Sequence, residues 1–382
     1  MDFTLSKKHL LLQDLYKQFA EKEVKHLAGE VDETEDFPYE TVDKMAKIGL
    51  LGIPFAKEHG GGGSDNLAYA MCVEELSKVC ATTGVIVSAH TSLCAAPIYE
   101  HGTPEIKAKY LPKLASGQWL GAFGLTEAGA GTDAGMQQTK AVLDSDTGNY
   151  ILNGTKIFIT NAEAAHVYII TAMTDKSQGT RGLSAFIVEK DFPGFSIGKK
   201  EKKMGIKGSL TCELIMENCI VPKENLLGKE GRGFNIAMQT LDGGRIGIAA
   251  QALGIAQGAI DTTVAYVKER KQFGKRISAF QNTQFELADM QTKVDAARLL
   301  TYRAAYLKDS KKPHGKEAAM AKLYASEVAS DVTRRCLQLH GGYGYIREYP
   351  IERMMRDAKI TEIYEGTSEV QKMVIAAAMK VN

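Results

Sequence analysis

The sequence predicts an α+β multidomain protein with a helical N-terminal domain, a small antiparallel β domain in the middle and a C-terminal helix bundle. Apolar residues recur at helical spacing in the first and last thirds of the 382-residue chain. Between them, β-rich runs follow one another at short intervals, separated by Gly, Pro and Asn. We expect the domains to span residues 1–117, 118–225 and 226–382, and we find no internal repeat.

The N-terminal part is expected to be helical. Leu12, Leu15, Phe19 and Leu27 trace one helical stripe, and "AYAMCVEELSKVC" and "EIKAKYLPKLASG" continue the pattern. The glycine-rich stretch "EHGGGGSDN" lacks the Gly-Lys-Ser/Thr ending of a phosphate-binding P-loop. We therefore interpret it as a flexible connection.

The middle part is expected to form antiparallel strands. "NYILNGTKIFIT" contains two β-rich runs around Asn153-Gly154, a dipeptide that favours a two-residue hairpin turn. "HVYIITAMT", "GLSAFIVEK", "FSIGKK" and "CELIMENCIVP" follow as further strands. Such close spacing leaves no room for the helices of alternating β–α units.

A dinucleotide fingerprint is matched only as a bare pattern in "GAFGLTEAGAGTDAG", through Gly129, Gly131 and Ala134. That fingerprint has a physical meaning only where a strand ends and a helix begins. No helix of adequate length follows, so we expect no nicotinamide site. The glycines would still let backbone N–H groups approach a ligand, with Thr126 and Thr132 beside a phosphate or a flavin edge.

The C-terminal part carries long amphipathic segments typical of a helix bundle, from "GFNIAMQTLDGG" to "CLQLHGG". A last helix is predicted in "TSEVQKMVIAAAMK", capped by Thr367 or Ser368. Ser368 and Gln371 have the spacing of a capping box. Taken alone, Glu365 and Glu369 could simply complement the positive end of this helix's dipole.

The composition excludes several classes of protein. A net charge of +1, with 44% hydrophobic and 24% charged residues, indicates neither nucleic-acid binding nor electrostatic attachment to a membrane. The first residues do not resemble a signal peptide, and no apolar run reaches the roughly 20 residues of a membrane span. The six cysteines are scattered along the sequence, as expected for reduced thiols in the cytoplasm. The eight histidines form no pattern typical of metal ligands, so we expect no metal site.

Six motifs in order resemble those of the acyl-CoA dehydrogenases, most closely the short-chain (butyryl-CoA) type. They are "AFGLTEAGAGTDAG", "LNGTKIFITNA", "LDGGRIGIAAQALGIAQGA", "ERKQFGKRI", "LQLHGGYGY" and "RDAKITEIYEGTSEVQ", and together they cover essentially the whole chain. The resemblance implies an FAD enzyme that removes a proton from Cα and a hydride from Cβ of an acyl-CoA thioester. It also implies that electron-transfer flavoprotein exchanges the electrons and that the protein is a homotetramer.

Glu365, in "IYEGT", matches the position of the catalytic base in this family. A free Glu titrates near pH 4.3 and is a weak base at neutral pH, but burial beside the substrate and the flavin would raise its pKa. The nearby helix N-terminus opposes that rise, and we expect desolvation to prevail once substrate excludes water. Some relatives carry the base on another helix, where this chain has Gly244, which cannot abstract a proton.

The resemblance also implies the cofactor contacts. Residues that match positions beside the isoalloxazine are Leu125, Thr126, Phe158 and Thr160. Residues that match the pyrophosphate and adenosine contacts, in part from a neighbouring subunit, are Arg270, Gln272, Phe273, Gln338, Leu339, Gly341 and Gly342. Thr367 and Glu369 lie at the last helix's N-terminus, which suits a phosphate or ring edge, although Glu369 cannot donate to phosphate.

For the substrate, the resemblance places Thr132 near the pantetheine arm, with Leu241, Asp242, Arg245 and Gly366 along the thioester and the nucleotide. Asp242 and Arg245 could instead form only an ion pair within a helix, which contributes a few tenths of a kcal/mol. The backbone N–H of Glu365 is expected to donate to the thioester oxygen, as in an oxyanion hole.

Three functions remain open from the sequence. The first is a short-chain acyl-CoA dehydrogenase, which could also run in reverse on crotonyl-CoA. The second is an acyl-CoA oxidase-like enzyme or a dehydrogenase for branched or medium-length chains, although related oxidases generally carry a further C-terminal helical region. The third is a helical binding protein without flavin, against which Glu365, Arg270 and the two threonines argue.

Overall fold

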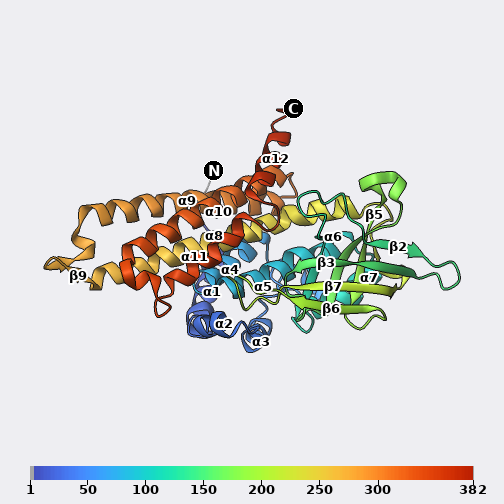
Figure 1. Cartoon of the computed structure of the whole chain (residues 1–382), viewed down its shortest axis with the longest axis horizontal. Helices are drawn as coiled ribbons and strands as arrows, with labels where there is room; N and C mark the ends of the chain where they lie inside the picture. The colour runs from blue at the N-terminus through green and yellow to red at the C-terminus, as the bar shows by residue number, and fades with distance from the viewer. Residues whose placement is uncertain (1–3, 382) are drawn as a thin grey trace.

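The computed structural model describes residues 4–381 and consists of helices at both ends of the chain with a sheet between them. Figure 1 shows the sheet at one end of the molecule and the long C-terminal helices extending from it. The predicted α–β–α order is confirmed.

The N-terminal helices form much of the core beneath the long C-terminal ones. They are α1 (Lys7–Phe19), α2 (Ala28–Thr34), α3 (Tyr39–Lys47), α4 (Asn66–Ser77), α5 (Ala81–Ser88), α6 (Ala96–His101) and α7 (Pro104–Ala115). A π-helical turn (Ala89–Ala95) joins α5 to α6. By length and composition the run Ala81–His101 could cross a bilayer, contrary to our expectation from the sequence, but its apolar 18-residue window is wholly buried inside the protein.

The sheet is mixed, which corrects the prediction of a purely antiparallel domain. Its strands are β1 (Gly121–Gly124), β2 (Lys140–Leu143), β3 (Tyr150–Ile159), β4 (Val167–Met173), β5 (Leu183–Glu189), β6 (Phe195–Lys200), β7 (Cys212–Val221) and β8 (Leu226–Leu227). The order is β6-β7-β3-β2-β4-β5-β8, with β1 also paired to β4. The β1–β4 and β2–β4 pairs are parallel. The long connections between these strands make parallel pairing possible.

The predicted hairpin at Asn153-Gly154 is wrong, because β3 runs straight through it. The Asn153 side chain bonds to Asn218 on β7, and the register of β3 against β7 shifts between Leu152 and Gly154. Gly154 has φ 151°, and an added Cβ would lie 2.4 Å from the hydroxyl of Thr139. This glycine therefore serves a bulge and a close strand approach, and the hairpin turn lies instead between β2 and β3.

The C-terminal part is built around α8 (Gly233–Glu269), which packs against α4, α9 and α10. Gly254 and Gly258 let α4 approach closely, since a Cβ at either would lie within 2.3 Å of an α4-side backbone oxygen. The other elements are α9 (Gln281–Asp309), α10 (Gly315–His340), α11 (Ile351–Lys359), α12 (Ser368–Ala378) and the short hairpin β9 (Lys271–Gln272) and β10 (Lys275–Arg276). β8, at the start of the expected C-terminal domain, pairs with β5.

Candidate active site

The chain turns sharply at Glu365 just before α12. Glu365 has φ 52° and Gly366 has φ 93°, so two successive residues are left-handed, which is uncommon for a glutamate. Thr367 caps α12 by accepting from the N–H of Val370 at 3.3 Å. The predicted capping box of Ser368 and Gln371 does not form.

Gln371 instead turns back to the corner. Its side-chain amide, fully buried, donates to the carbonyls of Glu365 at 3.2 Å and Gly366 at 2.8 Å. Lys322 of α10 donates to the same Gly366 carbonyl at 2.7 Å. Because both carbonyls are held from the α10 and α12 side, the corner is fixed before any ligand binds.

The Glu365 carboxylate is kept without a partner. Its Oε2 atom is buried and has no hydrogen bond among the described residues. Burial raises the pKa of Glu365 to about 7, against the opposing effects of Lys322 and Arg245. Desolvation therefore already outweighs the nearby positive charges in the protein without substrate. We had expected it to raise the pKa of Glu365 only once substrate is bound.

Gly244 of α8 provides the space for this carboxylate. A Cβ at Gly244 would lie 2.1 Å from Oε2 of Glu365 and 2.7 Å from Leu93. The sequence identified Gly244 only as a position that cannot act as a base. The structure adds that any side chain there would displace the Glu365 carboxylate.

The opposite wall is formed by the β domain, at Leu125, Thr126, Phe158 and Thr160. The carbonyl of Thr126 accepts from the N–H of Ile157 at 2.9 Å, which ties the end of β1 to β3. Phe158 has φ 59° and leaves 60% of its surface exposed. Phe158 therefore combines a left-handed backbone with an exposed aromatic ring, and that ring offers a flat apolar surface to a ligand.

A buried polar network fastens this wall. Lys156 is fully buried, and its ammonium donates to Glu127 and Gln137 at 2.7 Å each and to the carbonyl of Leu125 at 3.2 Å. Glu127 also accepts from the backbone N–H groups of Gln138 and Thr139. Burial alone would raise the pKa of Glu127, but Lys156 and these donors hold it below its usual value.

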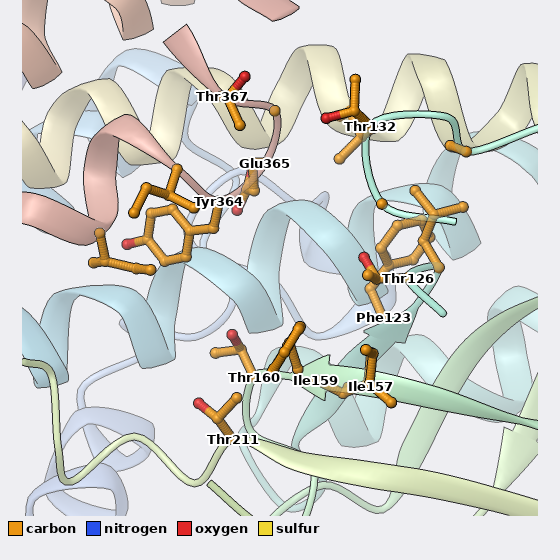
Figure 2. A pocket seen from close by; sticks show the side chains of 18 of the residues that line it. Phe123, Thr126, Thr132, Ile157, Ile159, Thr160, Thr211, Tyr364, Glu365 and Thr367 are labelled. Atoms are coloured by element: carbon orange, nitrogen blue, oxygen red, sulfur yellow. The ribbon is translucent and has the colours of Figure 1, made fainter. Parts of the chain in front are cut away.

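The two walls enclose a cavity of about 880 Å³, at the upper end of the range for small-molecule sites. In Figure 2, Glu365 and Thr367 lie on one side and Thr126 and Thr160 on the other. Predicted site residues that line the cavity are Glu365, Gly366, Thr367, Leu125, Thr126, Phe158, Thr160, Thr132, Leu241 and Arg245. Asp242 does not line it but bonds to Arg245 at 2.6 Å.

A second hollow of about 530 Å³ gathers most of the remaining predicted residues: Arg270, Gln272, Gln338, Leu339, Gly341 and Gly342. Its residues come from the C-terminal end of α8, from β9 and from the end of α10, and Figure 1 shows β9 at the end of the molecule away from the large sheet. Phe273 and Glu369 line neither hollow. Phe273 is 93% exposed, and the pKa of Glu369 is lowered by its own backbone N–H and by Thr367.

Sequence reasoning missed the buried residues that hold the site. Lys156 and Gln371 lie within quoted motifs that assign neither of them this role, Lys322 lies in none of the motifs, and a lysine in an amphipathic helix or strand usually indicates a solvated face. The one available signal was Gln371, which was noticed for its spacing but assigned to a capping box.

Three family models match successive parts of the chain. They describe the N-terminal domain of acyl-CoA dehydrogenase at residues 6–118, the middle domain at 122–219 and the C-terminal domain at 231–380. A short-chain specific acyl-CoA dehydrogenase of Clostridium acetobutylicum is 61% identical, with 98% of this chain and 99% of that one covered. An acryloyl-CoA reductase (NADH) of Anaerotignum propionicum is 56% identical over 98% of this chain and 95% of that one.

Solved structures agree over the full length. The butyryl-CoA dehydrogenase of Megasphaera elsdenii superposes with a TM-score of 0.98 at 51% identity, with both chains fully covered. A chain solved in work on the electron transferring flavoprotein of Acidaminococcus fermentans and flavin-based electron bifurcation gives 0.98 at 56%, again with both chains fully covered. An acyl-CoA dehydrogenase of Bacillus anthracis complexed with FAD gives 0.93 at 35%, covering 99% of this chain and 67% of that one. The chain belongs to the acyl-CoA dehydrogenase family.

Proposed function

We propose that this protein is an FAD-dependent dehydrogenase of short-chain acyl-CoA thioesters, converting butyryl-CoA to crotonyl-CoA with Glu365 as the base. The observation that carries the proposal is the buried, unpartnered carboxylate of Glu365, which faces a large cavity and has a pKa of about 7. A base with this pKa is half ionised at neutral pH and is matched to the abstraction of a weakly acidic proton.

The residues present fit FAD. The exposed ring of Phe158 and the hydroxyls of Thr126 and Thr160 form a wall suited to a flat polar ring system. Gly131 also lines the cavity, and a Cβ added there would meet no protein atom within 4 Å. When bound, FAD would accept the hydride that leaves Cβ.

The chain's own residues would orient the thioester and move the proton. Glu365 takes the proton from Cα, while its backbone N–H donates to the thioester oxygen, on which negative charge develops. Arg245, almost fully buried and held by Asp242, lines the cavity beside Leu241 and would fix the thioester arm. Thr132 would contact the pantetheine. Gly366, which has no side chain, would allow the substrate to approach the backbone closely.

A short acyl chain is supported by the wall of the cavity next to Glu365. Leu93 lines the cavity, and a Cβ at Gly244 would lie 2.7 Å from Leu93 and 2.1 Å from the Glu365 carboxylate, so the side chain of Leu93 forms the wall at this point. Ala89 and Val85, both buried, line the cavity on the same side. The names of the relatives from Clostridium and Megasphaera agree with this substrate class.

We also infer a homotetramer in which the second hollow serves a neighbouring subunit's FAD. The stretch of α8 from Arg245 to Tyr266 spans about 30 Å, so the two hollows are far apart within one chain. Arg270 and Gln272, with Gly341 and Gly342, would meet the pyrophosphate and adenosine. Phe273, Gln338 and Leu339 would complete that contact, and Thr367, with Glu369 beside it, would approach the ring edge.

Electron-transfer flavoprotein is the electron partner that we propose, supported by the relative solved together with work on such a flavoprotein. The name of the Anaerotignum relative supports operation in the reducing direction as well. The cysteines are all buried free thiols, which favours the reducing cytoplasm.

The proposal is tested by mixing the FAD-loaded protein anaerobically with acyl-CoA thioesters from C4 to C16 and recording the rate at which the yellow band bleaches. We expect the fastest bleaching with butyryl-CoA. A maximum at C8 or longer, or a colourless protein that takes up no FAD, would overturn it. Reoxidation by electron-transfer flavoprotein rather than by oxygen distinguishes a dehydrogenase from an oxidase.

A further inference from the structure

Lys322 is a fully buried lysine in the N-terminal half of α10. Its ammonium donates to the Gly366 carbonyl at 2.7 Å and forms no ion pair within 4 Å in residues 4–381. Burying an ammonium without a neutralising partner is costly. A charge kept in such a place calls for a reason, and among the carboxylates that act on it, Glu365 has the largest effect.

The groups that face Glu365 come from three helices and from its own segment. Arg245 of α8 is positive but already bound to Asp242. Tyr69 of α4 and the adjacent Tyr364 are neutral, because burial raises the pKa of each phenol. Lys322 is thus the positive charge near Glu365 that has no carboxylate bound to it.

Two further acids act on Lys322 from the rim of the same corner. Glu362 and Glu369 both favour its charged form, but neither forms an ion pair with it within 4 Å. Glu362 is bound to Lys359, and Glu369 is exposed. Neither acid therefore removes the effect of Lys322 on Glu365.

The backbone of the corner depends on the same lysine. The Gly366 carbonyl accepts from both Lys322 and Gln371, and Gln371 also binds the Glu365 carbonyl. These donors hold the carbonyls on the α10 and α12 side, although Glu365 must adopt a left-handed conformation that is strained for a non-glycine residue. The Glu365 side chain is thereby left facing the cavity.

We propose that Lys322 is a positioning residue for Glu365, holding the Gly366 carbonyl to fix the corner and supplying the buried positive charge that keeps the carboxylate ionised. The inference rests on the proposed role of Glu365 as the base. Lys322 touches neither cavity nor substrate in this arrangement, so it acts only through its neighbours.

Lys322→Met removes both the charge and the donor, and Lys322→Gln keeps a donor without the charge. The readout is the pH dependence of Cα–H exchange into deuterium oxide, measured by mass spectrometry. The probe is a butyryl-CoA analogue with sulfur in place of Cβ, which can lose a proton but no hydride.

In the parent, exchange should rise with pH as Glu365 ionises. Loss of a nearby positive charge disfavours the carboxylate, so both variants should move this rise to higher pH by about one unit, giving about tenfold slower exchange at pH 6. Lys322→Gln should recover more of the plateau rate than Lys322→Met, since it can still donate to Gly366.

Lys293→Met is the matched control, because Lys293 lies on α9 and pairs with Asp289 and Asp331 away from the cavity. A merely structural role for Lys322 would lower the thermal midpoint and leave the pH of the rise unchanged, which would overturn the proposal. If Lys322→Met does not fold, Lys322→Gln alone tests the proposal: a shift of its exchange profile to higher pH supports it, and an unchanged profile contradicts it. Exchange that persists in Glu365→Gln would instead refute the base assignment itself.

Discussion

The two walls of the cavity use buried charge in opposite ways. On the β-domain wall, Lys156 and Glu127 are bound to each other and to surrounding groups, so each charge has its partners. On the helical wall, Oε2 of Glu365 has no partner, and neither has Nε of Arg245 among the described residues. The first wall is built to stay in place, whereas the second keeps unsatisfied groups that a ligand can engage.

That difference supports the proposal that the helical wall carries the reactive group. A polar network whose groups are all hydrogen-bonded to one another stabilises the fold and leaves no free group to react with a substrate. A desolvated carboxylate without a partner is destabilising in the free protein and gains from taking a proton. If this contrast holds, substitutions in the β-domain wall should mainly lower the free energy of unfolding, and substitutions in the helical wall should mainly lower the reaction rate.

The largest expected effect is on the reactive wall. Glu365→Gln, still loaded with FAD, should lose at least 10³-fold in the rate of butyryl-CoA oxidation, because the amide cannot accept the α-proton. Flavin bleaching under anaerobic conditions measures the loss. A rate within tenfold of the parent would place the base elsewhere.

Lys156→Met tests the other wall. Removing one partner leaves Glu127 buried without its ammonium, which should lower the free energy of unfolding by about 3–5 kcal/mol. Urea denaturation measures it, with Lys25→Met as the control, since that exposed pair with Glu21 should contribute less than about 1 kcal/mol. A loss for Lys156→Met no larger than that for Lys25→Met would contradict the view that the buried pair stabilises the β-domain wall.

Gly244→Ala should damage chemistry more than stability. The new methyl group would displace the Glu365 carboxylate, and a misplacement of about 1 Å can cost about 10²-fold in rate. The adjacent Gly243→Ala is the control, because its Cβ would meet only the end of the long Lys308 side chain. The kcat values of the two variants should differ by more than tenfold; similar values would mean that the space at Gly244 is not needed.

The smallest effect is a gain in stability. Because the folded pKa of Glu365 is about 7 and the unfolded value near 4.5, the folded state binds more protons between these values, and stability falls as pH rises through that window. Glu365→Gln removes this cost. It should unfold with a free energy about 3 kcal/mol higher than the parent at pH 8 and little different at pH 4, as measured by urea titration.

Amphipathic periodicity and β-rich runs predict the order of the domains and the long helices, whereas the residues that meet at the cavity are predicted only by the resemblance of the motifs to the family. It misplaces the hairpin at Asn153-Gly154, since a bulge against β7 uses the same two residues as a turn. Lys156 and Lys322 are not predictable from it. Their burial arises from partners such as Gln137 and Gly366, which the fold brings together from distant positions.

The most direct test is the pH dependence of kcat/KM for butyryl-CoA, which reports the ionisation of the free enzyme. If the Glu365 carboxylate is the base in its dry, unpartnered corner, kcat/KM should rise about tenfold per pH unit at low pH and level off above about pH 7. A rise that is complete by about pH 5 would contradict it, because the carboxylate would then titrate as if exposed to water.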